Sequence, residues 1–581
     1  MSGSTYWLNA RKGPSSATPS ASAPRPRPPS VPLLSRRRLL KAAGAVAAGT
    51  GALLAACGGR GNAPPAATSG SGGAASSTAP KRGGTLGVVQ VSSTNNLNPV
   101  TNFQEGYVLA GVNVYDRLVS ARPNLHFSNQ YRLEAAASVE QPDGTTVIFK
   151  LKPGMKYQNL PPVSGRAVTA ADIVKSQQFV RDNPRAENNS FQRGSMDSVS
   201  APDEATVVFK LKAPNAYLFS GTQLANSGAQ CIIPPELLDN LDTASPVGSG
   251  PYQMDSYELN VHYRYRRYDG YRESAKGLPY IDVREYSVLQ DPAAQEAAFR
   301  SAQAQLWNPP LPSLVDSVVR DMGSKVVAES WLPLTMQTLV FNITRPPWND
   351  VRVREAMYRI VNRQQWLDLI WQGKGKVPAG ALSAGLAAYQ LDPKQTEKYF
   401  KQDMKAAKQL LDAAGFPYSK EFDMPLFNRP QDLQGGDIFK QQVAPLGIKV
   451  QVRALPAADW LGTVAGQAQY DIWFAAHPSY DSPQVPLRLQ TSETQNLHKI
   501  AGLRDPAVDQ LIYKSETIVD PQAQIQAVKD IQIALLDKYT PMIYIDTYNA
   551  YALHYSFVRD YEINAGSTPE PMYRSEMWLD R

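Results

Sequence analysis

The sequence predicts a mixed α/β (α+β) body that begins near Lys81, because strand and helix patterns alternate from there to the end of the chain. Two stretches, residues 143–152 and 203–212, repeat one strand pattern, and no solenoid period or long heptad run is present. With 43% hydrophobic and 19% charged residues, the composition is typical of a globular protein with a sizeable core. The 581 residues are enough for roughly three to four domain-sized units.

β-Branched residues mark the expected strands. Residues 84–91 read Gly-Thr-Leu-Gly-Val-Val-Gln-Val, which is typical of a strand. Residues 143–152 and 203–212 each open with turn residues and continue as Thr-Val-Ile-Phe-Lys-Leu and Thr-Val-Val-Phe-Lys-Leu. We expect these two stretches to be strands of one small antiparallel sheet.

Capping residues mark the starts of the expected helices. Thr169 is placed to cap a helix that begins with Ala-Ala-Asp-Ile-Val. Asn349 or Asp350 can cap a helix with a continuous apolar face. The residues of that face are Val353, Met357, Ile360, Val361, Leu367 and Ile370.

Two further helices are indicated by their ends. Residues 403–414 predict a helix that is closed by Gly415, since glycine adopts the left-handed conformation with little strain. Asp520 followed by Pro521 opens another helix, because proline is favoured at the first helical position.

The net charge of +7 arises from the first 56 residues. That segment has no acidic residue and eight basic ones: Arg11, Lys12, Arg25, Arg27, Arg36, Arg37, Arg38 and Lys41. Loss of these eight charges would change the net charge from +7 to −1. A near-neutral body lacks the basic surface that nucleic-acid binding requires, so we expect no nucleic-acid partner.

Residues 1–56 have the order of a removable export signal. The run Ser-Arg-Arg-Arg-Leu-Leu-Lys at residues 35–41 resembles the twin-arginine (Tat) signal. Leu39 stands where that motif usually has Phe, which leaves the twin-arginine and general export routes both open. The apolar stretch at residues 42–56 is too short and too rich in Ala and Gly for a membrane span.

Residues 54–57, Leu-Ala-Ala-Cys, resemble a lipobox, in which a peptidase cleaves before the Cys and the sulfur carries a diacylglycerol. The resemblance implies lipidation of Cys57 and a firm membrane anchor. The alternative is an alanine-rich helix that ends in Cys by coincidence. Residues 57–80 consist mostly of Gly, Ala, Ser, Thr and Pro and predict a flexible tether.

The sequence contains no catalytic or metal-binding motif. The five histidines lack the paired spacing of a metal site: His126, His262, His477, His498 and His554. Residues 247–251, Val-Gly-Ser-Gly-Pro, predict a tight turn rather than a nucleophile elbow, and no Gly-Lys-Ser or Gly-Lys-Thr loop occurs. Cys231 has no intrachain partner once Cys57 is processed, which predicts a buried thiol. We expect no catalytic residue, metal or cofactor, whereas 28 Tyr and 9 Trp suit an aromatic-lined cleft.

Seven segments occur in a distinctive order, among them Val-Gly-Ser-Gly-Pro-Tyr and Asp-Pro-Ala-Val-Asp. They are residues 150–157, 169–174, 247–252, 277–282 with 291–292, 340–344 with 347–356, 406–415 and 505–509. Together they resemble family 5 of the bacterial extracellular solute-binding proteins, a group that includes dipeptide, oligopeptide and nickel receptors. The resemblance covers about residues 81–580. Because these segments start helices and shape bends, they indicate the fold without revealing the ligand.

The resemblance implies a two-lobed, type II periplasmic-binding-protein fold with an extra small domain inserted in lobe one. The lobes would close on a ligand, and the insert would contain the two similar strands. The implied ranges are 81–125, 241–331 and 541–581 for lobe one, 126–240 for the insert, and 332–540 for lobe two. The chain would cross between the lobes near Trp331 and near Pro541.

Ligand specificity is where the sequence departs from the family pattern. Peptide-binding relatives have a Trp and, three residues later, an Asp that pairs with the α-amino group of the ligand. In residues 470–483, His477 takes the place of that Trp and Tyr480 the place of that Asp, and Asp481 follows. Asp481 either binds the amine through a one-residue shift or caps a turn before a proline. The candidate ligand-binding residues are Trp473, His477, Tyr480 and Asp481.

The resemblance implies the substrate-binding subunit of an ABC importer, which captures a peptide or similar solute and delivers it to permease and ATPase subunits. We expect a monomer that is extracytoplasmic and lipid-anchored at the periplasmic or outer face of the cell membrane. Two alternatives remain, a sensory receptor that signals to a membrane protein and a secreted hydrolase. A neighbouring permease and ATPase pair would argue against the first, and recovery of intact ligand would argue against the second.

Overall fold

The computed structural model describes residues 79–581 with short interruptions. The residues outside the description are 1–78, 92–93, 103–105, 122–130, 188, 221–222, 226, 478–481, 493–502, 504 and 564–574. The predicted export signal, most of the tether and Cys57 therefore lie outside the described residues. Among the helices that the structure describes, none combines the length and the apolar character needed to cross a membrane.

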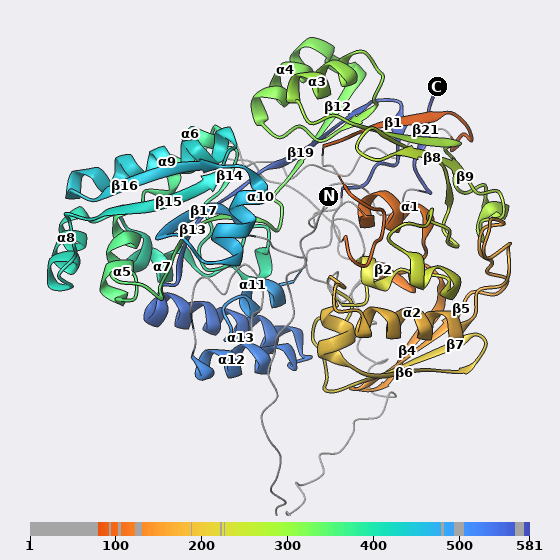
Figure 1. Cartoon of the computed structure of the whole chain (residues 1–581), viewed down its shortest axis with the longest axis horizontal. Coiled ribbons are helices and arrows are strands. Elements are labelled where there is room, and N and C mark those ends of the chain that lie inside the picture. The colour runs from red at the N-terminus through yellow and green to blue at the C-terminus, as the bar shows by residue number, and fades with distance from the viewer. Residues whose placement is uncertain are drawn as a thin grey trace, which may run out of the picture. The chain divides into compact units, whose positions relative to one another are not determined.

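The largest sheet, sheet A, combines strands from both ends and from the middle of the described chain (Figure 1). Its strands, in sheet order, are β12 (Val326–Trp331), β19 (Ala550–Tyr555), β11 (Leu306–Trp307), β1 (Thr85–Gln90), β10 (Val283–Val288), β9 (His262–Arg267) and β8 (Tyr252–Glu258). β1 runs parallel to β10 and β11, and the other neighbours are antiparallel. Helices α3 (Pro292–Arg300) and α4 (Pro312–Met322) precede β11 and β12. The predicted strand at residues 84–91 is confirmed as β1.

The two similar stretches form the central strands of an antiparallel sheet, sheet B. Its strands, in sheet order, are β4 (Ala136–Asp143), β5 (Thr146–Leu151), β7 (Thr206–Leu211) and β6 (Met196–Asp203). Phe149 lies opposite Val207, and both side chains are buried. Helix α2 (Ala170–Asp182) packs against β6 and β7, and Thr169 and Asp172 form a capping box at its start. The predictions of this sheet and of the Thr169 cap are confirmed.

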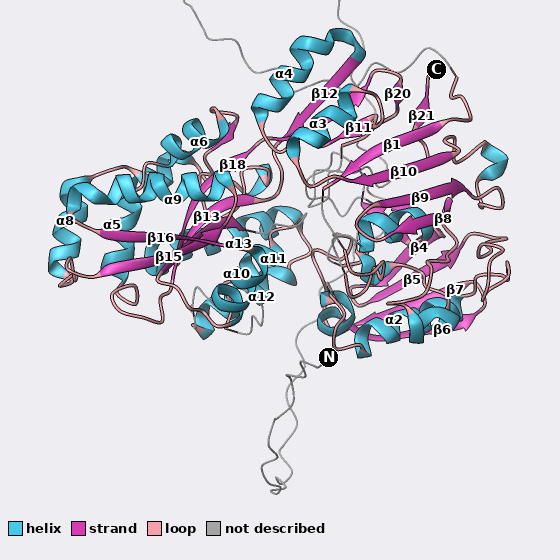
Figure 2. Ribbon diagram, turned by 45° about the horizontal axis from the view of Figure 1, so that its top comes forward, coloured by secondary structure: helices cyan, strands magenta, loops and turns pink. Residues whose placement is uncertain are grey.

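A third sheet, sheet C, lies among the helices at the left of Figure 2. Its strands, in sheet order, are β14 (Gly375–Lys376), β18 (Met542–Tyr548), β13 (Met336–Phe341) and β17 (Ile472–His477). The parallel pair β15 (Glu421–Phe427) and β16 (Lys449–Leu455) lies next to it, with β15 beside β17. Helix α9 (Pro430–Val443) contacts β15, β16 and β17.

The single helix expected after Asp350 is instead two helices, and this prediction was wrong. Asp350 caps α5 (Val351–Ile360), and a second helix, α6 (Arg363–Trp371), follows. The backbone between them is extended, and the Asn362 side chain accepts a hydrogen bond from the backbone N–H of Gln365 (3.1 Å). This new cap starts α6, although the apolar spacing continues across the break.

The remaining helices connect these sheets. They are α1 (Val112–Val114), α7 (Pro393–Phe400), α8 (Met404–Ala413), α10 (Ala457–Trp460), α11 (Gln484–Arg488), α12 (Pro506–Glu516) and α13 (Pro521–Ala534). Two short strand pairs are β2 (Val119–Ala121) with β3 (Tyr131–Leu133) and β20 (Val558–Arg559) with β21 (Trp578–Leu579). Asp403 caps α8, Gly415 has a φ of 66° after it, and Asp520 caps α13. Both predicted helix ends are confirmed.

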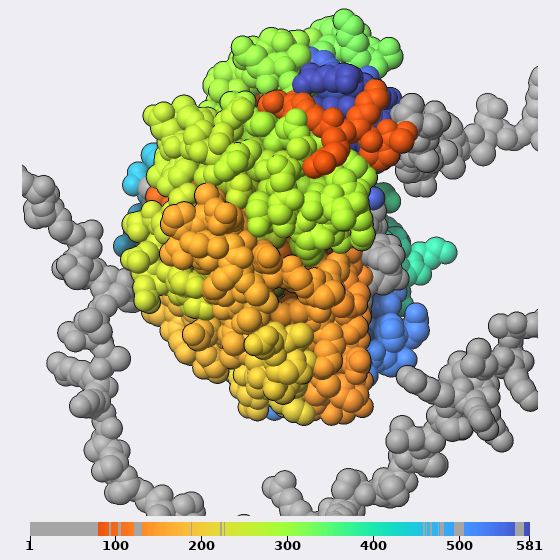
Figure 3. Space-filling view, turned by 90° about the vertical axis from the view of Figure 1, so that its right-hand side faces the viewer, coloured from red at the N-terminus to blue at the C-terminus, as the bar shows by residue number. Residues whose placement is uncertain are grey.

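The buried apolar side chains of the described residues form two separate clusters. One extends over sheets A and B and takes side chains from residues 86–326 and 551–579. The other surrounds sheet C and takes side chains from residues 334–545. In Figure 3 the orange and yellow surface around sheet B adjoins the green surface that includes β8 to β10, as a shared core requires.

The chain passes between the two clusters twice. The first passage follows β12, and the second lies at Asn549, between β18 in sheet C and β19 in sheet A. The second crossing was expected near Pro541. It lies later because β18 pairs with β13 over residues 542–546 and so belongs to sheet C. The other predicted lobe limits stay predictions.

Candidate ligand-binding site

The carboxyl ends of β15, β16 and β17 lie along one edge of the sheet C region. β15 and β16 are parallel. β17 starts beside the start of β15, since the backbone N–H of Asp471 donates to the carbonyl oxygen of Asp423 (3.1 Å). In α/β layers, ligands bind outside the carboxyl ends of parallel strands. Polar side chains at this edge are therefore the candidates for ligand contacts.

The structure places two of the four predicted ligand residues. Trp473 lies inside β17, is only 2% exposed, and packs edge-on against Trp460 with ring centroids 5.4 Å apart. This position is in the core around sheet C. His477 is the last residue of β17, with its backbone opposite Met336, and its side chain lies outside the description. Tyr480 and Asp481 lie outside the described residues, so their roles stay predictions.

Sequence reasoning missed Asp546, an acid in the buried strand β18. Its side chain is 0% exposed, and neither carboxylate oxygen has a hydrogen-bond partner among the described residues. Burial alone raises the pKa of Asp546 to about 8. Gln337 lies opposite on β13, next to a β-bulge, and its side-chain oxygen Oε1 is also buried without a partner in the part of the chain that the structure describes. One feature of the sequence could have indicated this residue, because it is the only charged residue in the mostly apolar run Met-Ile-Tyr-Ile-Asp-Thr-Tyr at residues 542–548.

A charged pair and an aromatic stack flank the start of α9. Arg429, the residue before the helix, forms an ion pair with Asp432 in its first turn. The guanidinium lies 4.7 Å from the ring centroid of Phe427, the last residue of β15. Phe427 in turn stacks on Trp460 with centroids 4.3 Å apart. Burial raises the pKa of Asp432, although Arg429 opposes this change.

Tyr548 lies at the end of β18, two residues after Asp546. Its ring stacks on Trp371 at the end of α6, with centroids 3.7 Å apart. Burial raises the pKa of Tyr548 to about 12, and the charges of Asp546, Arg429 and Asp432 also act on its phenol.

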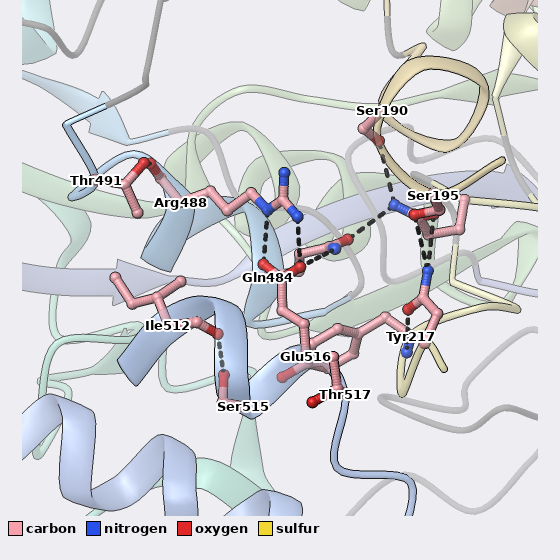
Figure 4. Close-up of polar contacts among 12 residues, drawn as sticks. Ser190, Ser195, Tyr217, Gln484, Arg488, Thr491, Ile512, Ser515, Glu516 and Thr517 are labelled. Carbon is pink, nitrogen blue, oxygen red and sulfur yellow. Dashed lines mark hydrogen bonds and ion pairs between the residues drawn. The ribbon is translucent and has the colours of Figure 1, made fainter. Parts of the chain in front are cut away.

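A polar network joins the segment after sheet B to helices α11 and α12 (Figure 4). Gln223 Nε2 donates to Gln484 Oε1 (3.0 Å), and Gln484 Nε2 donates to Glu516 Oε2 (3.0 Å). Arg488 contacts the same carboxylate through Nε (2.6 Å) and Nη2 (2.5 Å). The backbone N–H of Ala216 donates to the carbonyl oxygen of Glu516 (2.7 Å). The network thus connects parts of the chain that belong to different hydrophobic clusters.

A second buried contact supports the same connection. Gln524 of α13 donates a hydrogen bond to the hydroxyl oxygen of Tyr217 and accepts one from the Tyr389 hydroxyl (2.7 Å). All three side chains are buried. Hydrogen bonds between buried groups are worth roughly 0.5–1.5 kcal/mol each, so the combined contact favours the arrangement seen here.

Charged side chains also meet in a hollow beside β2 and β3, lined in part by Asp116, Arg117, Glu134 and Arg272. Here each charge has an opposite partner. Arg117 Nη2 lies 2.7 Å from Glu134 Oε1, and Arg272 forms an ion pair with Asp116. Because these charges neutralise one another, the hollow is a weaker ligand candidate than the Asp546 edge.

The structure describes no catalytic constellation. Residues 247–251 form a bend in which Gly250 N–H donates to the Val114 carbonyl oxygen (2.8 Å), and a Cβ on Gly248 would lie 2.3 Å from that oxygen. Glycine is thus required for close backbone approach. Cys231 is buried as predicted, and burial raises the pKa of its thiol to about 12. Within the described ranges, no group of three or more His, Cys, Asp or Glu side chains could bind a metal ion.

Comparison with known proteins gives the family. The model of the bacterial extracellular solute-binding proteins, family 5, matches residues 130–497. The glutathione-binding protein GsiB of Salmonella typhi is 24% identical over 409 residues, which cover 67% of this chain and 75% of GsiB. GsiB of Escherichia coli K12 is 24% identical over 407 residues, with the same coverage.

Solved structures share the fold. The periplasmic binding protein DppA of Helicobacter pylori, solved with the peptide STSA, matches with a TM-score of 0.73 at 19% identity over 86% of this chain and 99% of DppA. The oligopeptide-binding protein AppA of Bacillus subtilis, solved with a nonapeptide, matches with a TM-score of 0.71 at 18% identity over 87% and 100%. NikA of Staphylococcus aureus, solved with Ni(L-His)2, matches with a TM-score of 0.67 at 18% identity over 85% and 99%.

The chain therefore has the type II periplasmic-binding-protein fold and is an extracytoplasmic solute receptor rather than an enzyme. It belongs to family 5 of the bacterial extracellular solute-binding proteins, as the substrate-binding component of an ABC importer. The family, fold class and function expected from the sequence are confirmed.

Proposed function

We propose that the chain captures a peptide or a related small solute between two lobes and presents it to a membrane permease. The observation that carries this proposal is the pair of separate hydrophobic clusters joined by two chain passages. Two rigid bodies connected by short passages can close by a hinge motion. The peptides in the similar DppA and AppA structures support a peptide as the ligand class.

The lobes in this proposal follow the two clusters. Lobe one comprises sheets A and B, with sheet B as its insert, and lobe two comprises sheet C with its helices. The network of Gln223, Gln484 and Glu516 joins the lobes and favours the closed arrangement. Closure would cover the edge that carries Asp546 and the end of β17, so a solute held there would be shielded from water.

The direct test is native mass spectrometry of the purified full chain, followed by release and sequencing of any bound solute. We expect an intact peptide-sized molecule that stays unchanged during prolonged incubation with the protein. Conversion of added peptides into fragments would instead indicate a hydrolase. A closed-to-open change in scattering radius on removal of the solute would support the hinge.

We also propose that Cys57 carries a lipid anchor. The receptor itself would be a monomer that delivers its solute to separate permease and ATPase subunits. The basic run at residues 35–41 and the Leu-Ala-Ala-Cys run at residues 54–57 support export and anchoring. We expect Cys57→Ala to move the protein from the membrane fraction to the soluble fraction in a bacterial host. Cys231→Ala is the matched control and should stay in the membrane fraction, because Cys231 is buried. Equal membrane recovery of both variants would contradict the anchor.

A further inference from the structure

Asp546 differs from the other acids of the described chain. Among the described carboxylates, it alone has both oxygens buried without a hydrogen-bond partner. Asp116 and Asp432, which each have one such oxygen, form ion pairs with Arg272 and Arg429. A buried carboxylate is strongly disfavoured unless it is neutral or meets a cation or hydrogen-bond donors. The position therefore calls for a donor that the described residues do not supply.

The strand register adds a second acceptor to this position. Asp546 on β18 lies opposite Gln337 on β13, and Gln337 lies opposite Ala476 on β17, so the three share one face of sheet C. Side chains directly opposite on antiparallel strands have Cβ atoms about 4.5–5.5 Å apart. Gln337 and Asp546 are thus cross-strand neighbours next to a β-bulge, and both carry buried oxygens without a partner among the described residues. Adjacent acceptors suit a group that has several donors and no acceptor, and an ammonium group has three donors.

The neighbouring strands place this pair of acceptors at the predicted ligand edge. Ala476 is one residue before the end of β17, and the segment with Tyr480 and Asp481 follows directly. With strands about 4.8 Å apart, Asp546 lies about 10 Å across the sheet from Ala476. The side chain of Thr547, the next residue, instead bonds to Ser383 Oγ (3.1 Å) and to the Ala384 N–H (2.9 Å). Strand alternation therefore turns Asp546 away from those contacts.

The nearby cation does not neutralise Asp546. Arg429 acts on the same Tyr548 phenol as Asp546 does, but its guanidinium is paired with Asp432 and lies over Phe427. A divalent metal ion would need several more oxygen ligands than one carboxylate and one amide provide. A ligand with a single positive group matches this set of acceptors better.

We propose that Asp546, together with Gln337, binds the primary ammonium group of the captured solute. This inference rests on the proposed peptide-receptor function and specifies its ligand as an amine-bearing one. It gives the amine-binding role to a strand residue at the second passage between the lobes instead of to Asp481. Closure then places the ammonium group among buried acceptors, where a charge-assisted hydrogen bond is strong.

The test uses two pools of random tetrapeptides without Lys or Arg, one with free N-termini and one N-acetylated. Equilibrium dialysis with mass spectrometry measures the affinity of the full chain for each pool. We expect wild type to bind the free-amine pool at least tenfold more tightly than the acetylated pool. Asp546→Asn should lose at least tenfold in affinity for the free-amine pool and change little toward the acetylated pool. Asp423→Asn, at the opposite end of β15, is the matched control and should behave as wild type.

The outcomes separate the two proposals. Equal binding of both pools by wild type would overturn the ammonium proposal and leave the peptide receptor intact. Undiminished free-amine binding by Asp546→Asn would overturn the role of Asp546. If wild type bound neither pool, the peptide function itself would fail, and the ammonium proposal with it. The comparison of pools needs wild type alone, so it decides whether the ammonium group is recognised even if a variant does not fold, and Asp546→Asn tests which residue binds it.

Discussion

The buried charges of the two lobes differ in one respect. Beside β2 and β3, Arg117 and Glu134 lie 2.7 Å apart, Arg272 pairs with Asp116, and no side chain of the four is more than 11% exposed. In sheet C, Asp546 is equally buried and has no charged partner within hydrogen-bond distance among the described residues. Each charge of the paired group has an opposite charge beside it, whereas the lone acid has none among the described residues.

The pKa values of Glu134, which has a charged partner, and of Asp546, which has none among the described residues, differ in the same way. Burial alone would raise the pKa of Glu134, but Arg117 and its hydrogen bonds outweigh burial and lower that pKa below its usual value. Burial raises the pKa of Asp546 to about 8 with no opposing charge. A charged partner thus opposes the effect of burial on the pKa of a carboxylate, fully at Glu134 and only in part at Asp116 and Asp432. This lesson separates charges that stabilise the fold from a charge that is available to a ligand.

The largest expected effect comes from breaking the paired group. Glu134→Ala leaves Arg117 charged and buried, which should lower the free energy of unfolding by about 3–5 kcal/mol. Urea denaturation followed by circular dichroism measures this change. The double variant Arg117→Met with Glu134→Leu removes both charges and should recover most of the loss. A single variant within 1 kcal/mol of wild type would show that the pair is not structural.

The second prediction concerns how the stability of the folded chain depends on pH through Asp546. The pKa of Asp546 is raised in the folded chain to about 8, so the folded state binds its proton more tightly than the unfolded state. The stabilisation that protonated Asp546 contributes is fully present below about pH 4 and is lost as the pH rises to about 8. Asp546→Asn should therefore be more stable than wild type by up to about 5 kcal/mol at pH 8 and similar at pH 4.

Thermal unfolding of the ligand-free proteins across this pH range checks the pH prediction. Burial also raises the pKa of Asp432, and Arg429 lies nearby, so both proteins share that background. The difference between the two curves isolates Asp546. Parallel curves from pH 4 to pH 8 would show that Asp546 does not titrate as proposed.

A smaller effect is expected from the contact between the lobes. Gln484→Ala removes the link from Gln223 to Glu516, which is worth about 0.5–1.5 kcal/mol. Solute affinity should fall about two- to tenfold because the closed arrangement loses support. Equilibrium dialysis measures affinity, and the melting temperature of the ligand-free protein serves as the control. An unchanged affinity would show that this contact does not support closure.

The smallest effect is expected at an exposed pair. Arg185 and Asp242 lie 2.6 Å apart with side chains 68% and 31% exposed, so solvent screens their attraction. Arg185→Ala should change the free energy of unfolding by less than about 1 kcal/mol. Its urea denaturation curve provides the baseline for Glu134→Ala. A loss as large as that of Glu134→Ala would remove the distinction between buried and exposed pairs.

Much of the fold could be predicted from the sequence because local signals agree with the tertiary structure. The two similar stretches pair as β5 and β7, Thr169 and Asp520 stand at the helix starts expected of them, and the helix predicted over residues 403–414 is α8. The break at Asn362 was missed because apolar spacing continues through it, and only the cap reveals it.

The site was harder to predict because it depends on distant residues. Trp473 has the aromatic character of a cleft residue, yet its strand position buries it against Trp460. Asp546 stood in the sequence as an acid in an apolar strand, but the missing partner becomes evident only when Gln337 lies opposite. Burial and pairing are tertiary properties, which a linear pattern does not contain.

The central claim is that a bound ammonium group completes Asp546, and proton release on binding tests it most directly. Isothermal titration calorimetry with the free-amine tetrapeptide pool at pH 6.5, in buffers of different ionisation enthalpy, counts the protons released. Asp546 should be neutral before binding and ionised afterwards, so wild type should release about one proton per peptide and Asp546→Asn none. Equal proton release by the two proteins would contradict the claim.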